Sequence, residues 1–80
     1  MVWTSRSEQV VTEVAREYGV KVDDIRGRKR DPLTVDARDK AMYTLAVPMG
    51  LGVVRVARMF DRNSTSVGRS VRRHLRKEEQ

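Results

Sequence analysis

The sequence predicts an all-α fold, a compact bundle of about five helices. Apolar residues recur at three- and four-residue spacing in several stretches, which is the period of one face of a helix. Glycine or proline interrupts the chain between these stretches. The alternation of apolar and polar residues that is typical of a strand is weak. The best candidate is "GVVRV" at residues 52–56, but the apolar residues that follow it continue at helical spacing. The 80 residues provide one small domain, residues 1–80, whose core we expect over about residues 5–77.

The first predicted helix begins at residues 5–8, where "SRSE" has the capping-box pattern, and it ends before Gly19. One face of this helix carries the apolar set Val11, Val14, Ala15 and Tyr18. A single further turn of helix is predicted over residues 22–25. The stretch "GRKRDPLT", residues 27–34, is predicted to be a loop, because a glycine opens it and a proline interrupts it.

A second long helix is predicted to begin near Thr34 or Val35. Asp36 would lie in its first turn, where a carboxylate suits the helix dipole. Its apolar stripe is formed by Ala41, Met42, Leu45 and Met49. Because proline cannot continue a helix, Pro48 should end it at about residues 47–49.

Two more helices are predicted in the C-terminal part. The first covers residues 53–60, where helical spacing links Val53, Val56, Ala57 and Phe60. The second is capped by Asn63, with Ser64 as the alternative cap. Its buried face is predicted from residues four apart, Val67, Val71 and Leu75. Off that face lie Arg69, Arg72, Arg73 and Arg76.

The chain is strongly basic, with 17 Lys and Arg against 11 Asp and Glu, a net charge of +6 and a pI of about 10.5. Most of these cations are arginines, which fork onto phosphates and guanine edges. They concentrate in "RGRKR", residues 26–30, and again after residue 61. This distribution predicts a polyanionic partner. The alternative is a solvated basic face without a partner.

The composition argues against several functional classes. The chain has no cysteine and a single histidine, His74, so we predict no His/Cys metal site, no histidine-dependent triad, no cofactor and no enzyme activity. We expect His74 to face solvent or phosphate. No P-loop motif is present, so no ATP binding is predicted. Apolar runs are too short for a membrane span and the N-terminus lacks a signal-peptide core, which favours the cytoplasm.

The segment "MFDRNSTSVGRSVRRH", residues 59–74, has the order of a helix-turn-helix, whose second helix enters the major groove of DNA with its N-terminal end. Candidate contacts to base edges or phosphates at that end are Asn63, Ser64, Thr65 and Ser66. Asn63 and Ser64 have the simpler alternative role of capping the helix. Arg69 lies one turn later and is expected to fork onto a guanine. The candidate phosphate contacts further along are Arg72, Arg73 and Arg76.

Three stretches in this order resemble the C-terminal DNA-binding domain (domain IV) of the bacterial replication initiator DnaA, over about residues 8–77. They are "VVTEVAREYGVKVDDIRGRKR", "RDKAMYTL" and "DRNSTSVGRSVRR". The first resembles that domain's opening helix, turn and basic loop. The second matches the family's "RQIAMYL" at Arg38, Ala41, Met42 and Tyr43. The third matches the signature "GRDHSTVLHAVRK" at Arg62, Val67, Val71 and Arg72.

The resemblance implies a Trp-repressor-like helix-turn-helix whose signature residues read the major groove. It also implies that an arginine of the basic loop, Arg30 or Arg28, reaches the adjacent minor groove, which attracts arginine where it is narrow and A·T-rich. The predicted DNA contacts are therefore Arg28, Lys29, Arg30, Arg38, Arg62, Asn63, Ser64, Thr65, Ser66, Arg69, Arg72 and Arg73.

The sequence departs from the family's pattern at positions that affect target choice. Asp61 alone stands where the family has Gly-Gly before the signature arginine. The family's Asp-His pair is Asn-Ser here, at residues 63–64, and Arg69 replaces a histidine. We therefore expect a target other than the initiator's usual origin box. Asp-Ala at residues 36–37 replaces an Arg-Pro, which removes one phosphate contact.

We expect sequence-specific binding of double-stranded DNA by a transcriptional regulator at the bacterial nucleoid, with a further protein or the rest of a larger chain as a second partner and no membrane. The first alternative is a replication-origin or transposon-end binding module. The second is a protein-interaction module with an apolar patch of Trp3, Met42, Val47 and Met49. Single-stranded RNA is disfavoured, because no aromatic residue lies among the arginine clusters.

Overall fold

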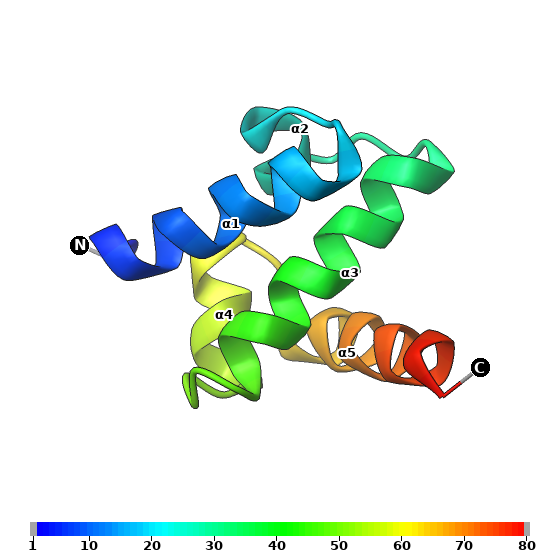
Figure 1. Cartoon of the computed structure of the whole chain (residues 1–80). Coiled ribbons are helices and arrows are strands. Elements are labelled where there is room, and N and C mark those ends of the chain that lie inside the picture. Colours follow the sequence, from blue (N-terminus) through cyan, green and yellow to red (C-terminus); the bar gives the residue numbers. More distant parts are fainter. Residues whose placement is uncertain (1, 80) are drawn as a thin grey trace.

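The all-α prediction is confirmed: the computed structural model describes residues 2–79 and contains only helices and connecting segments in that range. The helices are α1 (Ser5–Tyr18), α2 (Val22–Arg26), α3 (Pro32–Ala46), α4 (Val53–Met59) and α5 (Ser64–Glu78) (Figure 1). The central helix is α3, which contacts each of the other four. Figure 1 shows α1 and α2 on one side of α3 and α5 on the other.

The cap of α1 differs from the predicted one at residues 5–8. Thr4 is the N-cap, and its hydroxyl accepts a hydrogen bond from the Ser7 backbone N–H at 3.2 Å. The Ser7 hydroxyl accepts in return from the Thr4 N–H at 2.8 Å. A serine thus fills the place of the usual glutamate, so Glu8 is not part of the capping box. The C-terminal end is as predicted, because Gly19 adopts a left-handed φ of 67°.

The start of α3 lies at Pro32, earlier than the predicted Thr34 or Val35. The side chain of Asp31 accepts a hydrogen bond from the Thr34 N–H at 3.1 Å and so caps the helix. Proline is favoured in the first turn because the helix needs no N–H donor there. The loop after α2 therefore ends at residue 31, and Asp36 lies beyond the first turn.

The buried face of α5 also differs from the prediction. Val67 and Val71 are buried, but Leu75 is 38% exposed, and His74 is only 6% exposed. Residues four apart move about 40° around a helix at each step, so the third member of such a series leaves the face. His74 follows Val67 by seven residues and returns to it. The expectation that His74 faces solvent or phosphate is wrong, since the residue is buried and its ring packs on Tyr43 with centroids 5.0 Å apart.

The turn between α4 and α5 contains one residue in the left-handed region, Asp61, with a φ of 54°. Glycine adopts this conformation most easily, and aspartate tolerates it better than most other residues. The position corresponds to the Gly-Gly of the family pattern. A single left-handed residue is therefore enough to make the corner in this chain.

Trp3 braces this corner from the N-terminal segment. Its indole Nε1 donates a hydrogen bond to the Met59 carbonyl at 2.9 Å. The ring meets Phe60 edge-on with centroids 5.3 Å apart, and the Arg26 guanidinium lies 4.1 Å from the ring centroid. The segment before α1 is thereby attached to the end of α4, next to the turn that leads into α5.

Replacing Trp3 with alanine should lower the free energy of unfolding by about 2 kcal/mol, because it removes a half-buried ring, a hydrogen bond and a cation–π contact. Urea denaturation followed by far-UV circular dichroism measures this change. Val54→Ala is the control, since Val54 is 62% exposed and its replacement should cost less than about 0.5 kcal/mol. Equal stability of the two variants would show that the brace contributes nothing.

Candidate nucleic-acid interface

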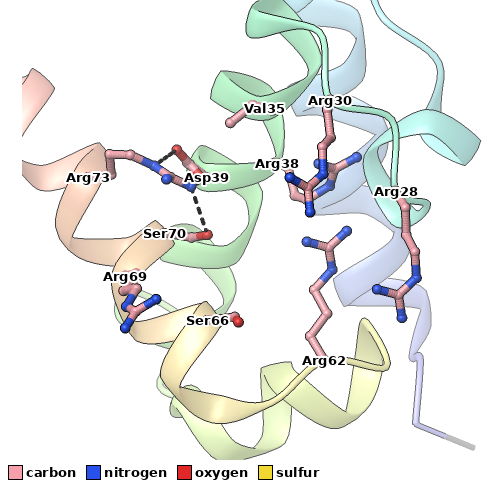
Figure 2. A pocket seen from close by; sticks show the side chains of 10 residues that line it. All are labelled: Arg28, Arg30, Val35, Arg38, Asp39, Arg62, Ser66, Arg69, Ser70 and Arg73. Carbon is pink, nitrogen blue, oxygen red and sulfur yellow. Dashed lines mark hydrogen bonds and ion pairs between the residues drawn. The ribbon is translucent and has the colours of Figure 1, made fainter.

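An open cleft with a volume of about 570 Å³ lies between α5 and the segment that runs from the end of α2 into α3 (Figure 2). Six arginines line it together with one carboxylate, Asp39. They are Arg28 and Arg30 from the basic loop (residues 27–31), Arg38 from α3, Arg62 from the turn before α5, and Arg69 and Arg73 from α5. This arginine cleft gathers cations that are far apart in the sequence, so its potential suits a polyanion.

The start of α5 borders this cleft. Asn63 is the N-cap, as predicted, and its side-chain oxygen accepts a hydrogen bond from the Ser66 N–H at 2.8 Å. Asn63, Ser64 and Thr65 are exposed, and Ser66 is half-buried in the wall of the cleft. The positive end of the helix dipole and free backbone N–H groups coincide here. The helix therefore presents an accessible hydrogen-bonding surface at its N-terminal end.

The basic loop and the turn before α5 are joined by two hydrogen bonds in opposite directions. Arg62 Nη2 donates to the Gly27 carbonyl at 2.6 Å, and Arg28 Nη2 donates to the Asp61 carbonyl at 3.1 Å. Burial lowers the pKa of Arg62, and the nearby charges of Arg28 and Arg30 lower it further. Its Nε is buried without a hydrogen-bond partner. Because arginine stays protonated at neutral pH, an anion in the cleft would stabilise this group.

Arg38 has a structural role, since it is buried, with only 4% of the residue exposed. Its Nε donates to the Ile25 carbonyl at 2.8 Å and its Nη2 to the Asp24 carbonyl at 2.6 Å. These carbonyls belong to the last turn of α2, where a helix leaves acceptors unpaired. Burial lowers the pKa of Arg38, and the charge of Arg62 adds to that effect. Arg38 thus attaches α2, and with it the start of the basic loop, to α3.

Arg73 is forked onto a buried carboxylate. Its Nε lies 2.9 Å from Asp39 Oδ2 and its Nη2 lies 3.0 Å from Asp39 Oδ1. The Asp39 side chain is 3% exposed, whereas that of Arg73 is 52% exposed. This hydrogen bonding is the main reason why the pKa of Arg73 is raised. Sequence reasoning missed Asp39, because 34 positions separate the partners and no local pattern links them.

The remaining predicted contacts differ in how free they are. Arg30 and Arg69 are exposed and form no ion pair with the carboxylates that the structure describes. Lys29 is exposed and lies 3.7 and 3.8 Å from two neighbouring carboxylates, which is a weak attachment. Brought together in the cleft are Arg28, Arg30, Arg38, Arg62, Ser66, Arg69 and Arg73. Outside its lining lie Lys29, Asn63, Ser64, Thr65 and Arg72.

The apolar patch considered for a protein partner does not form as predicted. Met42 is fully buried in the core, while Trp3 and Met49 are half-buried against it. Val47 alone of the set is exposed, at 52%. Among the described helices, none combines the length and the apolar character needed to cross a membrane.

Comparison with known proteins decides the family. The family described as "Bacterial dnaA protein helix-turn-helix" matches residues 7–73. The chain belongs to this family. The chromosomal replication initiator protein DnaA of Aquifex aeolicus (strain VF5) is 38% identical over 65 residues, which cover 80% of this chain and 16% of that protein. No solved structure is significantly similar to the chain.

Membership in the DnaA helix-turn-helix family confirms the resemblance seen in the sequence. The matched range includes the basic loop, α4, the corner at Asp61 and most of α5. The chain is therefore a DNA-binding domain of the DnaA type, and the arginine cleft lies between the two segments of that domain that carry its basic residues.

Proposed function

We propose that this domain binds double-stranded DNA sequence-specifically as a module of the replication-initiator type. In this proposal the N-terminal end of α5 enters the major groove, and Arg30 or Arg28 of the basic loop enters the adjacent minor groove. The sequence alone favoured a transcriptional regulator and placed origin binding second. The similarity to a chromosomal replication initiator supports origin binding more directly, although this chain corresponds to only 16% of that protein.

The observation that carries the proposal is the arginine cleft between the two candidate groove readers. One DNA strand separates a major groove from the neighbouring minor groove, so its phosphates would lie between α5 and the basic loop. Arg62 lines this space, and a phosphate there would stabilise its guanidinium through charge, since its Nε is buried without a hydrogen-bond partner. Arg38 and Arg73 are partly occupied by protein acceptors, so we assign them to the support of the cleft, with direct phosphate contact as a second role.

The preferred sequence is proposed to differ from the initiator's usual box. The exposed start of α5 carries Asn-Ser at residues 63–64 instead of the family's Asp-His. Asn63 has donors left after capping, because only its side-chain oxygen is used by the Ser66 N–H. Arg69 replaces a histidine and carries a longer fork that matches guanine. Both changes alter which base edges the helix can pair with.

Selection from a random duplex library at about 150 mM salt, followed by sequencing, tests this function. An enriched motif with an A·T-rich flank is the expected result. Retention of DNA without any motif would contradict sequence-specific recognition. No retention at all would contradict the DNA-binding proposal, and a protein partner would then become the better explanation of the basic surface.

Binding to the selected duplex should weaken steeply with salt. If about five phosphates are neutralised, the logarithm of the association constant should fall with a slope of about −4 to −5 against the logarithm of the salt concentration. Arg72→Met should reduce the magnitude of this slope by about 1 and weaken all duplexes alike, because Arg72 is exposed and lies outside the cleft. Titration by fluorescence anisotropy at several salt concentrations measures both values. A slope near zero would contradict phosphate binding.

A further inference from the structure

The two hydrogen bonds between the basic loop and the turn before α5 form a reciprocal clamp. Arg62 reaches back to the Gly27 carbonyl over 35 positions, and Arg28 reaches forward to the Asp61 carbonyl over 33 positions. Figure 2 shows Arg62 extending across the cleft from the turn toward the arginines on the opposite side. We call this pair of hydrogen bonds the arginine clamp.

The arginine clamp joins the two elements that are proposed to enter neighbouring grooves. Arg62 lies two positions before the first residue of α5, and Gly27 lies three positions before Arg30. The described polar contacts of Arg30 itself include no ion pair, and those of Lys29 are long. The two ends of the basic loop are fixed to α3 through Arg38 and Asp31, and the clamp is the described hydrogen bonding that joins the loop directly to the turn before α5.

We infer that Arg62 is a positioning residue that sets the spacing between the basic loop and α5, and that it thereby couples minor-groove recognition to major-groove recognition. This inference rests on the proposed function. A loop that is held in place before DNA binds loses less conformational freedom on binding. Without the clamp, the loop arginine would have to be ordered by the DNA, and its preference for a narrow groove would be weakened.

The same residue also contributes charge, so the experiment must separate spacing from charge. Arg62→Met removes the charge and the hydrogen bond to the Gly27 carbonyl, and it leaves the hydrogen bond from Arg28 to the Asp61 carbonyl as the other half of the clamp. Arg62→Lys keeps the charge but is one bond shorter, so it reaches the Gly27 carbonyl less well. Arg58→Met is the matched control, because Arg58 is an exposed arginine on α4 with no polar side-chain contact in the described structure. Circular dichroism establishes that each variant is folded.

The first readout uses the free protein and needs no DNA. Backbone ¹⁵N relaxation should report order parameters of about 0.85 for residues 28–30 in the parent and below about 0.6 in Arg62→Met. The Arg58→Met control should retain the parent values. Unchanged order in the loop of Arg62→Met would overturn the inference and leave the proposed function untouched.

The second readout compares two duplexes that share the selected site and differ only in an A·T-rich or G·C-rich flank. We expect the parent to prefer the A·T-rich flank by about tenfold, and Arg62→Met and Arg62→Lys to reduce this preference to about twofold. Arg30→Met should remove the preference too, and Arg62→Met added to it should change the ratio no further. The Arg58→Met control should keep the tenfold ratio.

The outcomes separate the clamp from the function it serves. A mobile loop together with a lost flank preference supports the inference. A flank preference that survives in Arg62→Met while overall affinity falls would overturn it, because Arg62 would then be a phosphate contact only. A parent protein without any flank preference would contradict the minor-groove part of the proposed function, and the inferred coupling would fall with it even if the relaxation data showed a clamp.

Discussion

Replacing Arg73 with methionine is expected to lower the free energy of unfolding by about 2–3 kcal/mol. The change leaves the Asp39 carboxylate, which is 3% exposed, without the two hydrogen bonds that now reach it from Arg73. The guanidinium is half-exposed, so solvent already screens part of the pair, and the expected loss is below that for a fully buried pair. For a domain of this size the loss is a large share of the total stability, which is about 4–12 kcal/mol. Urea denaturation measures it.

Arg72→Met is the control for this change, because Arg72 is the neighbouring arginine on α5 and is exposed. It should alter stability by less than about 0.5 kcal/mol. Adding Asp39→Asn to Arg73→Met should recover part of the stability, since the buried group is then neutral. If Arg73→Met is as stable as Arg72→Met, the forked pair does not stabilise the fold. DNA binding by Arg73→Met, predicted to weaken for all duplexes alike, must be measured where the variant is folded.

Replacing Arg69 with methionine should weaken binding to the preferred duplex by about 1–3 kcal/mol and relax sequence choice at one position of the site. The physical reason is that Arg69 is exposed on the cleft side of α5 and forms no ion pair with the described carboxylates, so its fork is free for a guanine edge. Selection from the random duplex library with the parent and the variant measures the change directly. The stability of the free protein should stay within about 0.5 kcal/mol.

Arg76→Met provides the comparison for Arg69→Met. Arg76 is an exposed arginine on the same helix, two turns further on and beyond the lining of the cleft. The Arg76→Met replacement should weaken binding to all duplexes by a similar factor and leave the selected motif unchanged. If Arg69→Met also leaves the motif unchanged, its side chain contacts phosphate and the specificity of this domain lies elsewhere.

The parts of this fold that depend on neighbours in the sequence could be predicted well. The helix-turn-helix was found because Asn63 is a good cap and because Val67 and Val71 follow it at helical spacing. The end of α1 was found because Gly19 provides a left-handed cap. The starts of α1 and α3 were misplaced by one to three residues, since several neighbouring residues can cap a helix and only the folded chain shows which one does.

The features that depend on distant partners could not be predicted. Arg38 and Arg73 appeared in the sequence as free cations, yet one is held by carbonyls of α2 and the other by Asp39 of α3. His74 was expected to be exposed because it lies among arginines in the sequence. Residues spaced four apart shift gradually around the helix, so Leu75 points out of the core and His74 points into it. These contacts cannot be predicted from side-chain type or from the local spacing of apolar residues, because they form only when α3 packs on α2 and α5.

The brace formed by Trp3 gives this domain an optical reporter at a useful place. Trp3 is the chain's single tryptophan, and its indole touches Phe60 and Arg26 beside the turn that leads into α5. Indole emission responds to a nearby charge and to the water around the ring. Any rearrangement of the turn when a duplex binds should therefore change the emission of Trp3, so that binding can be followed in the unlabelled protein without an attached dye.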